Sequence, residues 1–253
     1  MLIYTDDQNY TNIANAIREL KGCTDTYKPE EMAPALDMMF FDYGISYDKF
    51  KDGYPTQATE VTTYGKKVVG AAGNEYLEKI NFSEDAEEIG DCAFAYCRNI
   101  DAITIPNTIK KIGAYAFCEC NDIRHVSIPD SVTSIGEYAF SYNNWATLDP
   151  IPESITRIEK GTFYAFCQLK RGTSGYDKIT LPKSITYIGD DAFYYSSFTN
   201  ITLTSTPSHI GEDAFGYFVK TLNVPWAEGE VEGAPWGATQ ATINYNYVAT
   251  TEV

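Results

Sequence analysis

The apolar positions of this chain recur in a short phrase, Ile-Gly-x-x-Ala-Phe, whose phenylalanines are spaced 23, 23, 23, 30 and 22 residues apart. A second phrase, Ile or Leu followed by Pro, any residue, Ser or Thr, and Ile or Val, precedes four of the six copies. A fixed period of this length predicts stacked repeats. The fourth copy is degenerate, with Glu159 where the glycine belongs. The phenylalanines are Phe94, Phe117, Phe140, Phe163, Phe193 and Phe215.

Each unit can be interpreted physically, and the third copy serves as the example. Residues 123–128 are short and β-branched, and the proline after them ends the expected strand. Val132 and Ile135 are expected to point inward at the next turn. Gly136 then allows a tight corner or a close backbone approach, and Phe140 returns to the core. One unit cannot bury its apolar side alone, so the copies must stack.

Residues 128–140, with the repeated phrases at both ends, resemble the BspA-like leucine-rich repeat family. The resemblance implies a curved, right-handed solenoid with a strand-lined face. Six repeats over residues 80–226 would form it, from short strands joined by turns or 3-10 segments. It implies no particular ligand, because a fold does not define a function.

Two irregularities interrupt the repeat. The fourth strand region, residues 143–150, is shifted by one residue and places a proline where the other units carry Thr104 or Ser127. A missing ladder donor there predicts a bulge. The interval after the fourth unit carries seven extra residues around 168–177. This insertion is either a loop on a binding face or a tolerated excursion.

The first 40 residues have a different pattern, typical of a small helical hairpin. Apolar side chains recur at helical spacing in residues 10–21 and again after Pro29, a residue favoured in a first helical turn. A hairpin of this size needs a partner surface, so we expect residues 1–40 to serve attachment or self-association. The side chains expected to do so are Ile13, Ile17, Leu20, Met32 and Leu36.

Residues 13–33 also resemble a short module of tail and other virion proteins of phages that infect Gram-positive hosts. The matching letters are Ala-Ile-Arg-Glu, then Thr-Asp-x-Tyr-x-Pro-x-Glu-Met-Ala, while Leu20 and Cys23 depart from the usual wording. The resemblance implies a virion location, with assembly in the host cytoplasm. It also implies partners among other virion proteins and copies of this chain.

The solenoid is expected to be closed at both ends. Residues 41–79 are interpreted as a linker and an N-terminal cap strand, with alternating residues 59–65 forming the strand. Residues 227–253 are interpreted as a C-terminal cap that ends in a strand at 241–247. Trp226 and Trp236 are expected to anchor this cap, with a ligand platform as the alternative. The same Pro-Trp-then-strand ending resembles phage-encoded members of the repeat family.

Charge restricts the partners. The chain carries 35 acidic and 19 basic residues, a net charge of −16. A phosphate backbone needs clustered cations, so nucleic acid is not an expected partner. Anionic lipid would be repelled as well. No apolar run approaches the roughly 18–20 residues that cross a bilayer, and the first residues lack the basic and apolar regions of a signal peptide. We therefore expect neither membrane insertion nor export by this route.

Catalytic motifs are missing from the sequence: it contains no nucleophile elbow, phosphate loop or dinucleotide fingerprint. Acidic pairs such as Asp190-Asp191 could suggest glycoside chemistry. However, an acidic residue follows the repeat glycine in four units, which favours a solvated edge, with a calcium ladder as the alternative. We expect no enzyme activity, metal or cofactor. The four positions are Asp91, Glu137, Asp190 and Glu212.

The cysteines and histidines offer no ligand set. The six cysteines form no C-x-x-C pair, and the two histidines, His125 and His209, fall in different repeats. Cys97 and Cys120 occupy the same position, three residues after the phenylalanine of their units. We expect them to be inward, packed, reduced thiols.

Tyrosines recur beside the repeat phenylalanine, one or two residues after it. Stacked units would bring these side chains together along one flank. Because tyrosine is amphipathic and has few rotamers, such a row could stack on sugars or fill a protein interface. The alternative is that each ring merely packs over its neighbour as part of the wall. The residues are Tyr96, Tyr142, Tyr164, Tyr194, Tyr195 and Tyr217.

These patterns lead to one functional expectation and two alternatives. The expectation is a non-enzymatic phage virion protein of the tail or baseplate that presents its repeats for host-surface adhesion or particle reinforcement. The first alternative is a BspA-like adhesin on a bacterial cell surface. The second, supported only by the acidic pairs, is a glycan hydrolase that uses Asp190 or Asp191.

Overall fold

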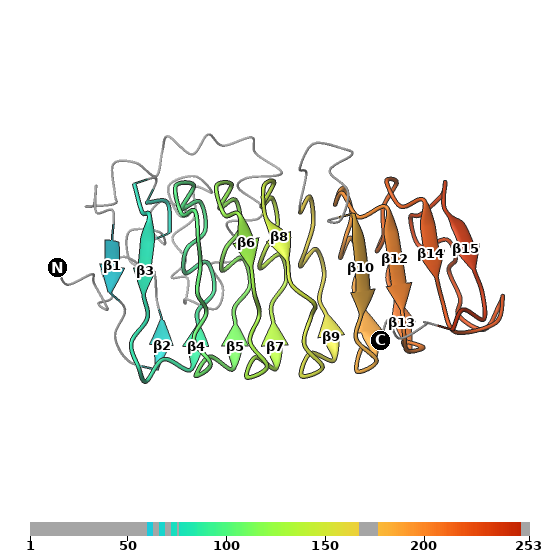
Figure 1. Ribbon diagram of the computed structural model, residues 1–253, viewed down its shortest axis with the longest axis horizontal. Helices are drawn as coiled ribbons and strands as arrows, with labels where there is room; N and C mark the ends of the chain where they lie inside the picture. The colour runs from blue at the N-terminus through green and yellow to red at the C-terminus, as the bar shows by residue number, and fades with distance from the viewer. Residues whose placement is uncertain (1–59, 63–65, 69–71, 75, 167–176, 249–253) are drawn as a thin grey trace, which may run out of the picture.

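The chain winds into an elongated parallel β solenoid, as the computed structural model shows (Figure 1). The structure describes residues 60–62, 66–68, 72–74, 76–166 and 177–248. Strands, turns and bends make up these residues, and none of them is helical. The helical hairpin expected in residues 1–40, and residues 168–176 of the insertion, lie outside them. The repeat solenoid is thus confirmed, and the hairpin stays a prediction.

One wall of the solenoid is a ladder of very short parallel strands that contain the repeat isoleucine. Each strand pairs with the equivalent strand of the next coil, for example Lys111 with Ser134 and Ile112 with Ile135. The isoleucine of each pair is buried and its neighbour faces outward. The strands are β2 (Lys67–Val68), β4 (Glu88–Ile89), β5 (Lys111–Ile112), β7 (Ser134–Ile135), β9 (Arg157–Ile158), β11 (Tyr187–Ile188) and β13 (His209–Ile210).

A second wall carries the strands that precede the proline phrase. They form three parallel groups, β1-β3, β6-β8 and β10-β12-β14-β15. In Figure 1 they make up the upper row of arrows. The strands are β1 (Glu60–Thr62), β3 (Lys79–Asn81), β6 (His125–Val126), β8 (Thr147–Leu148), β10 (Lys178–Leu181), β12 (Asn200–Leu203), β14 (Thr221–Asn223) and β15 (Thr242–Asn244).

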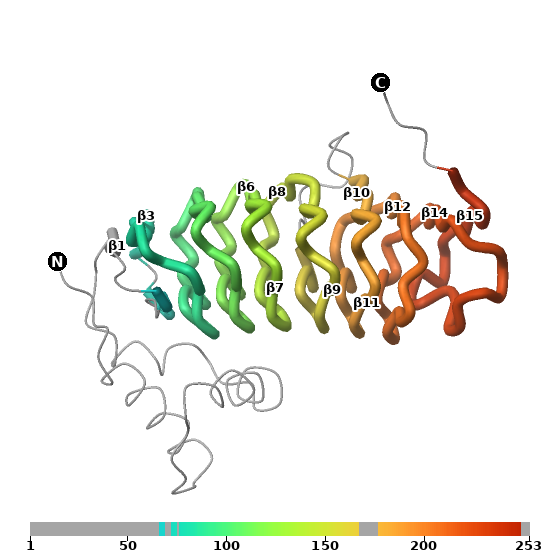
Figure 2. The backbone as a smooth tube through the Cα atoms, turned by 90° about the horizontal axis from the view of Figure 1, so that it is seen from below, coloured from blue at the N-terminus to red at the C-terminus, as the bar shows by residue number. Residues whose placement is uncertain are grey.

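The third wall consists of turns that follow the repeat glycine. Alternate N–H groups of one turn donate to carbonyls of the next coil, as from Cys92 to Ala114 and from Phe94 to Ala116, both at 2.8 Å. The same pattern continues up to the bond from Phe215 to Trp236 at 3.0 Å. Backbone hydrogen bonds therefore join neighbouring coils on this wall too. Figure 2 shows the coils side by side along the axis.

A stack of phenylalanine rings fills the centre. The six repeat phenylalanines are nearly parallel, with consecutive centroids 5.5, 5.5, 5.9, 5.5 and 6.3 Å apart. Phe82 closes the stack edge-on at one end, and Trp236 does so at the other, 6.3 Å from Phe215. Trp226 and Trp236 are both buried and contact each other edge-to-face. Both tryptophans therefore pack inside the cap, as expected.

The repeat glycine is needed because adjacent coils touch at that point. A Cβ on Gly136 would lie 2.7 Å from Ala114 Cα, and similar clashes arise at Gly90, Gly113, Gly189 and Gly211. The fourth coil has Glu159 instead. The strand ladder divides at this coil, between β7 and β9, because a side chain there prevents the same close approach.

Two expectations about the strands are refined. The strand expected at residues 123–128 spans only His125–Val126, because Ile123 still belongs to the preceding turn, where its N–H donates to Cys120 O. In the fourth unit His125 pairs with Thr147, 22 residues on, whereas the buried Ile128 and Ile151 are 23 apart. One extra residue is therefore accommodated after β8, as the proline predicted.

The expected end strands are present. Glu60–Thr62 pairs in parallel with Lys79–Asn81, and Thr242–Asn244 pairs with Thr221–Asn223. Across the insertion, Tyr187 pairs with Arg157 although 30 residues separate them. The extra residues therefore leave the ladder in register.

Candidate recognition surface

Several tyrosines of the turn wall are held in the left-handed backbone region. Each turn has two such positions, the first three residues after the repeat isoleucine and the second in most coils four residues later. Tyr115 and Tyr138 occupy the first, and Tyr96, Tyr142 and Tyr195 the second, with φ between 53° and 63°. A non-glycine residue is rarely stable there. The hydrogen bonds between coils impose this conformation on whatever residue occupies the position.

The tyrosine rings form an unbroken series of contacts across successive coils. Tyr115 stacks on Tyr138 at 5.2 Å, and Tyr138 meets Tyr164 at 6.2 Å. Tyr164 in turn contacts Tyr142 at 5.2 Å and Tyr195 at 5.8 Å. Phe218 links Tyr195 to Tyr217. We call this set the tyrosine strip: Tyr115, Tyr138, Tyr142, Tyr164, Tyr194, Tyr195 and Tyr217.

The strip is partly buried at its centre and open at one end. Tyr195 and Tyr217 are 45% and 52% exposed, and the other members are partly or fully covered. Burial raises the pKa of Tyr142 and of Tyr164, so both phenols stay protonated. The two hydroxyls also hydrogen-bond to each other. The strip therefore presents uncharged, preordered aromatic faces.

Carboxylates border the open end of the strip. Burial raises the pKa of Asp191; Lys160 opposes this shift, while the nearby Asp213, Asp190 and Glu212 add to it. Four acidic side chains thus gather beside the exposed tyrosines. This border disfavours anionic partners and favours neutral or cationic ones.

The structure joins five of the six tyrosines that the sequence singled out. Tyr96 lies apart, under the guanidinium of Arg98 at 5.5 Å. The sequence interpretation missed Tyr115 and Tyr138, although both stand three residues after a repeat isoleucine, a signal that was available. The expected attachment residues Ile13, Ile17, Leu20, Met32 and Leu36 lie outside the described residues.

A second row of stacked side chains also escaped prediction. Arg157 lies 3.7 Å above the ring of Tyr187, which stacks on His209 at 4.8 Å. The three are strand neighbours on β9, β11 and β13. The seven-residue insertion hides this relationship in the sequence.

The groups with catalytic potential have structural partners. Asp190 accepts a hydrogen bond from the Glu212 N–H at 2.9 Å, which ties one coil to the next. His125 contacts Thr147 Oγ1 at 2.9 Å and Asp149 at 3.2 Å. The Thr147 hydroxyl, however, donates to the carbonyl of Arg124, so its proton is not directed to the imidazole. In the described part of the chain, no three His, Cys, Asp or Glu side chains are grouped to bind a metal ion.

The predicted inward thiols are confirmed. Cys97 and Cys120 are fully buried, and Cys120 Sγ donates to the carbonyl of Phe94 at 3.0 Å. Burial raises the pKa of Cys97 to about 12. At the equivalent position of the next coil, Asn143 donates to the carbonyls of Phe117 and Phe140. This position therefore packs the core and satisfies backbone carbonyls.

Coils of this length with parallel ladders and a central aromatic stack define a leucine-rich repeat solenoid. Residues 72–176 and 171–229 match six copies of the family described as BspA type leucine rich repeat region. The matches span more than half of the chain, which therefore belongs to this family. A comparison with curated proteins finds no match.

Among solved structures, the chain is similar to a leucine-rich repeat protein from Bacteroides ovatus. The identity is 21%, the TM-score 0.46, and the match covers 74% of this chain and 61% of that one. A leucine rich cell surface protein from Faecalibacterium prausnitzii is 18% identical, with a TM-score of 0.40 and coverage of 70% and 62%. The chain thus spans less than two thirds of either protein.

Membrane crossing was examined as well. The described part of the chain has no helix with the length and hydrophobicity that a bilayer span requires.

Proposed function

We propose that this protein is a non-enzymatic recognition protein whose tyrosine strip binds a host-surface glycan or protein. The unbroken ring contacts from Tyr115 to Tyr217, ending in two exposed tyrosines, carry the proposal. Tyrosine offers a large contact area with little loss of side-chain entropy. Rings already held by their neighbours lose even less on binding, so the strip is preorganised.

An adhesion assay with the double variant Tyr195→Ala, Tyr217→Ala tests this proposal. The purified protein is applied to host cells and to an array of host-surface glycans. We expect the double variant to lose most binding while it unfolds at nearly the wild-type temperature, because both rings are about half exposed. Tyr187→Ala, which changes an aromatic on another wall, is the matched control. Full binding by the double variant would refute the role of the strip.

We further propose that a phage virion, in its tail or baseplate, carries the protein, with residues 1–40 as the attachment module. The resemblance of residues 13–33 to virion modules supports this assignment. Deletion of residues 1–40 should abolish incorporation into particles, measured by mass spectrometry of purified virions. Unaltered incorporation would overturn the attachment role.

A bacterial cell-surface adhesin of the BspA-like kind is the alternative carrier, supported by the family membership. The two carriers are distinguished by where the protein is recovered. Antibody labelling of purified particles supports the virion. Release by protease treatment of intact bacteria, without particles, supports the adhesin.

A further inference from the structure

Four residues mark one corner of the solenoid at intervals of 23: Tyr76, Asn99, Asp122 and Trp145. In each coil the following residue is fully buried and its N–H closes the same turn, from Leu77 to Asn74 and from Ala146 to Asn143. The four positions are therefore structurally equivalent. The two at the ends are large exposed aromatics, with Tyr76 51% and Trp145 42% exposed. Three strand spacings place them roughly 15 Å apart along the axis.

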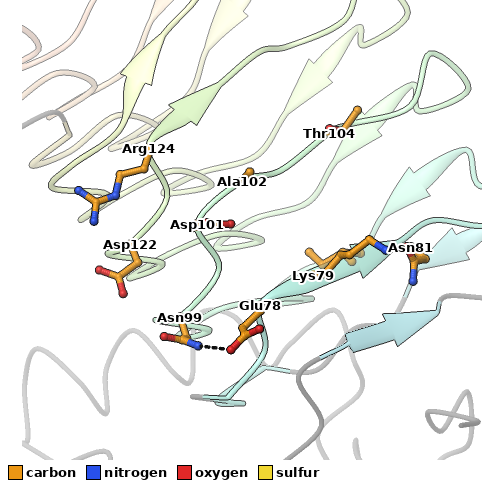
Figure 3. A pocket seen from close by; sticks show the side chains of 10 residues that line it. Glu78, Lys79, Asn81, Asn99, Asp101, Ala102, Thr104, Asp122 and Arg124 are labelled. Atoms are coloured by element: carbon orange, nitrogen blue, oxygen red, sulfur yellow. Dashed lines mark hydrogen bonds between the residues drawn. The ribbon is translucent and has the colours of Figure 1, made fainter.

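A polar hollow of about 720 Å³ lies on the strand-lined wall between these aromatics (Figure 3). It forms where the wall is interrupted: β3 pairs only with β1, β6 pairs with β8, and residues 102–104 belong to neither sheet. Ala102 provides space, because Lys79 and His125 occupy the matching outward positions of the adjacent coils. Asn99 and Asp122, the middle members of the corner row, line the hollow.

The side chains around the hollow are hydrogen-bonding groups of both kinds. Within the described ranges, the side chains of Asp101, Asp122 and Arg124 take part in no hydrogen bond or ion pair, while Asn99 donates to Glu78 at 3.4 Å. The hollow thus offers carboxylate acceptors beside a guanidinium donor. Three carboxylates face two cations across it, counting Glu78 and Lys79.

We propose that this hollow binds a short neutral or amino-bearing oligosaccharide, with Tyr76 and Trp145 stacking on sugar rings at its two ends. Sugar hydroxyls both donate and accept, which matches the mixed lining, and the apolar face of a sugar ring suits an exposed aromatic. The acidic balance disfavours sialylated glycans. The site lies on a different wall from the tyrosine strip, so it does not depend on the proposed function of the strip.

Fluorescence titration of the full chain tests the site. Trp145 is the exposed tryptophan, since Trp226 and Trp236 are buried, so stacking on it should shift the emission. The probes are maltotriose and triacetylchitotriose (neutral), chitotriose (amino-bearing) and 3′-sialyllactose (acidic). We expect a neutral or amino-bearing probe to bind, with affinity about tenfold lower in Trp145→Ala and in Ala102→Arg, a loss of roughly 1.4 kcal/mol. The variants are compared by calorimetry.

Controls separate this site from the strip and from misfolding. Ala102 is exposed, so arginine there should fill the hollow without unfolding the coil; Thr242→Arg, at an exposed position of β15, should bind as the wild type does. The Tyr195→Ala, Tyr217→Ala variant should also retain binding. Lack of binding by every probe, unchanged affinity in both hollow variants, or strongest binding of 3′-sialyllactose would each overturn the proposal.

Discussion

The carboxylate of Asp190 accepts a hydrogen bond from the backbone N–H of Glu212, one coil further on, at 2.9 Å. Asp91 makes the same bond to the N–H of Ala114 at 2.8 Å. Both acidic residues directly follow a repeat glycine, where the coils approach most closely. At this position a carboxylate thus links consecutive coils, which gives the recurring acidic residue a structural role.

Asp190→Ala should lower the free energy of unfolding by about 1–2 kcal/mol, because it removes a hydrogen bond to a charged group. Asp190→Asn keeps an acceptor oxygen and should lose less. Urea denaturation followed by circular dichroism measures both. Glu137→Ala, at the equivalent but exposed position, should stay within about 0.5 kcal/mol of the wild type. An equal loss in all three variants would show that the hydrogen bond is not the cause.

Gly136→Ala should destabilise the third coil by about 1–3 kcal/mol, because the new methyl group overlaps the backbone of Ala114. Backbone atoms cannot rotate away, so the coils must separate. Hydrogen exchange should show faster exchange at the Gly136 amide, which donates to Ile112 O at 2.9 Å. Unchanged exchange and an unchanged melting temperature would mean that the coils are not in such close contact.

The repeat made the core predictable from sequence. Because each coil stacks on an equivalent one, the burial of Phe140 implies the burial of Phe117 and Phe163, and their spacing was visible directly. The inward thiols of Cys97 and Cys120 followed from the same argument.

The recognition surfaces were harder to predict, because they depend on contacts between coils. Tyr115 and Tyr138 adopt a left-handed backbone that tyrosine does not favour by itself. The stack of Arg157 on Tyr187 joins residues whose spacing the insertion changes from 23 to 30. Local preference and a fixed period therefore both fail where neighbouring coils determine the geometry.

Tyr195→Gly and Tyr195→Ala should differ in stability although both remove the same ring. Tyr195 has φ 57°, a conformation that costs an ordinary residue about 1–2 kcal/mol and glycine much less. The glycine variant should therefore unfold at higher urea concentration than the alanine variant. Binding through the strip should be lost equally in both. Equal stability would indicate that the backbone at this position relaxes once the ring is removed.

Alkaline pH should destabilise the solenoid through its buried thiols. Burial raises the pKa of Cys97 to about 12 and that of Cys92 and Cys120 well above the usual value. An unfolded thiol ionises near pH 8.5, so the full stability is present below this pH. Above it the unfolded state loses protons that the folded state keeps. The free energy of unfolding should then fall by about 1.4 kcal/mol per pH unit for each such thiol, for Cys97 up to about pH 12.

Urea denaturation at pH 7 to 11 measures this slope, and the Cys97→Ala variant isolates one thiol. The variant should be less stable at pH 7, because it leaves a small cavity, but its stability should fall less steeply above pH 9. The difference between the two proteins should therefore shrink as the pH rises. Parallel curves would mean that the Cys97 thiol ionises as readily in the folded protein as in the unfolded chain, which its complete burial in the stack opposes.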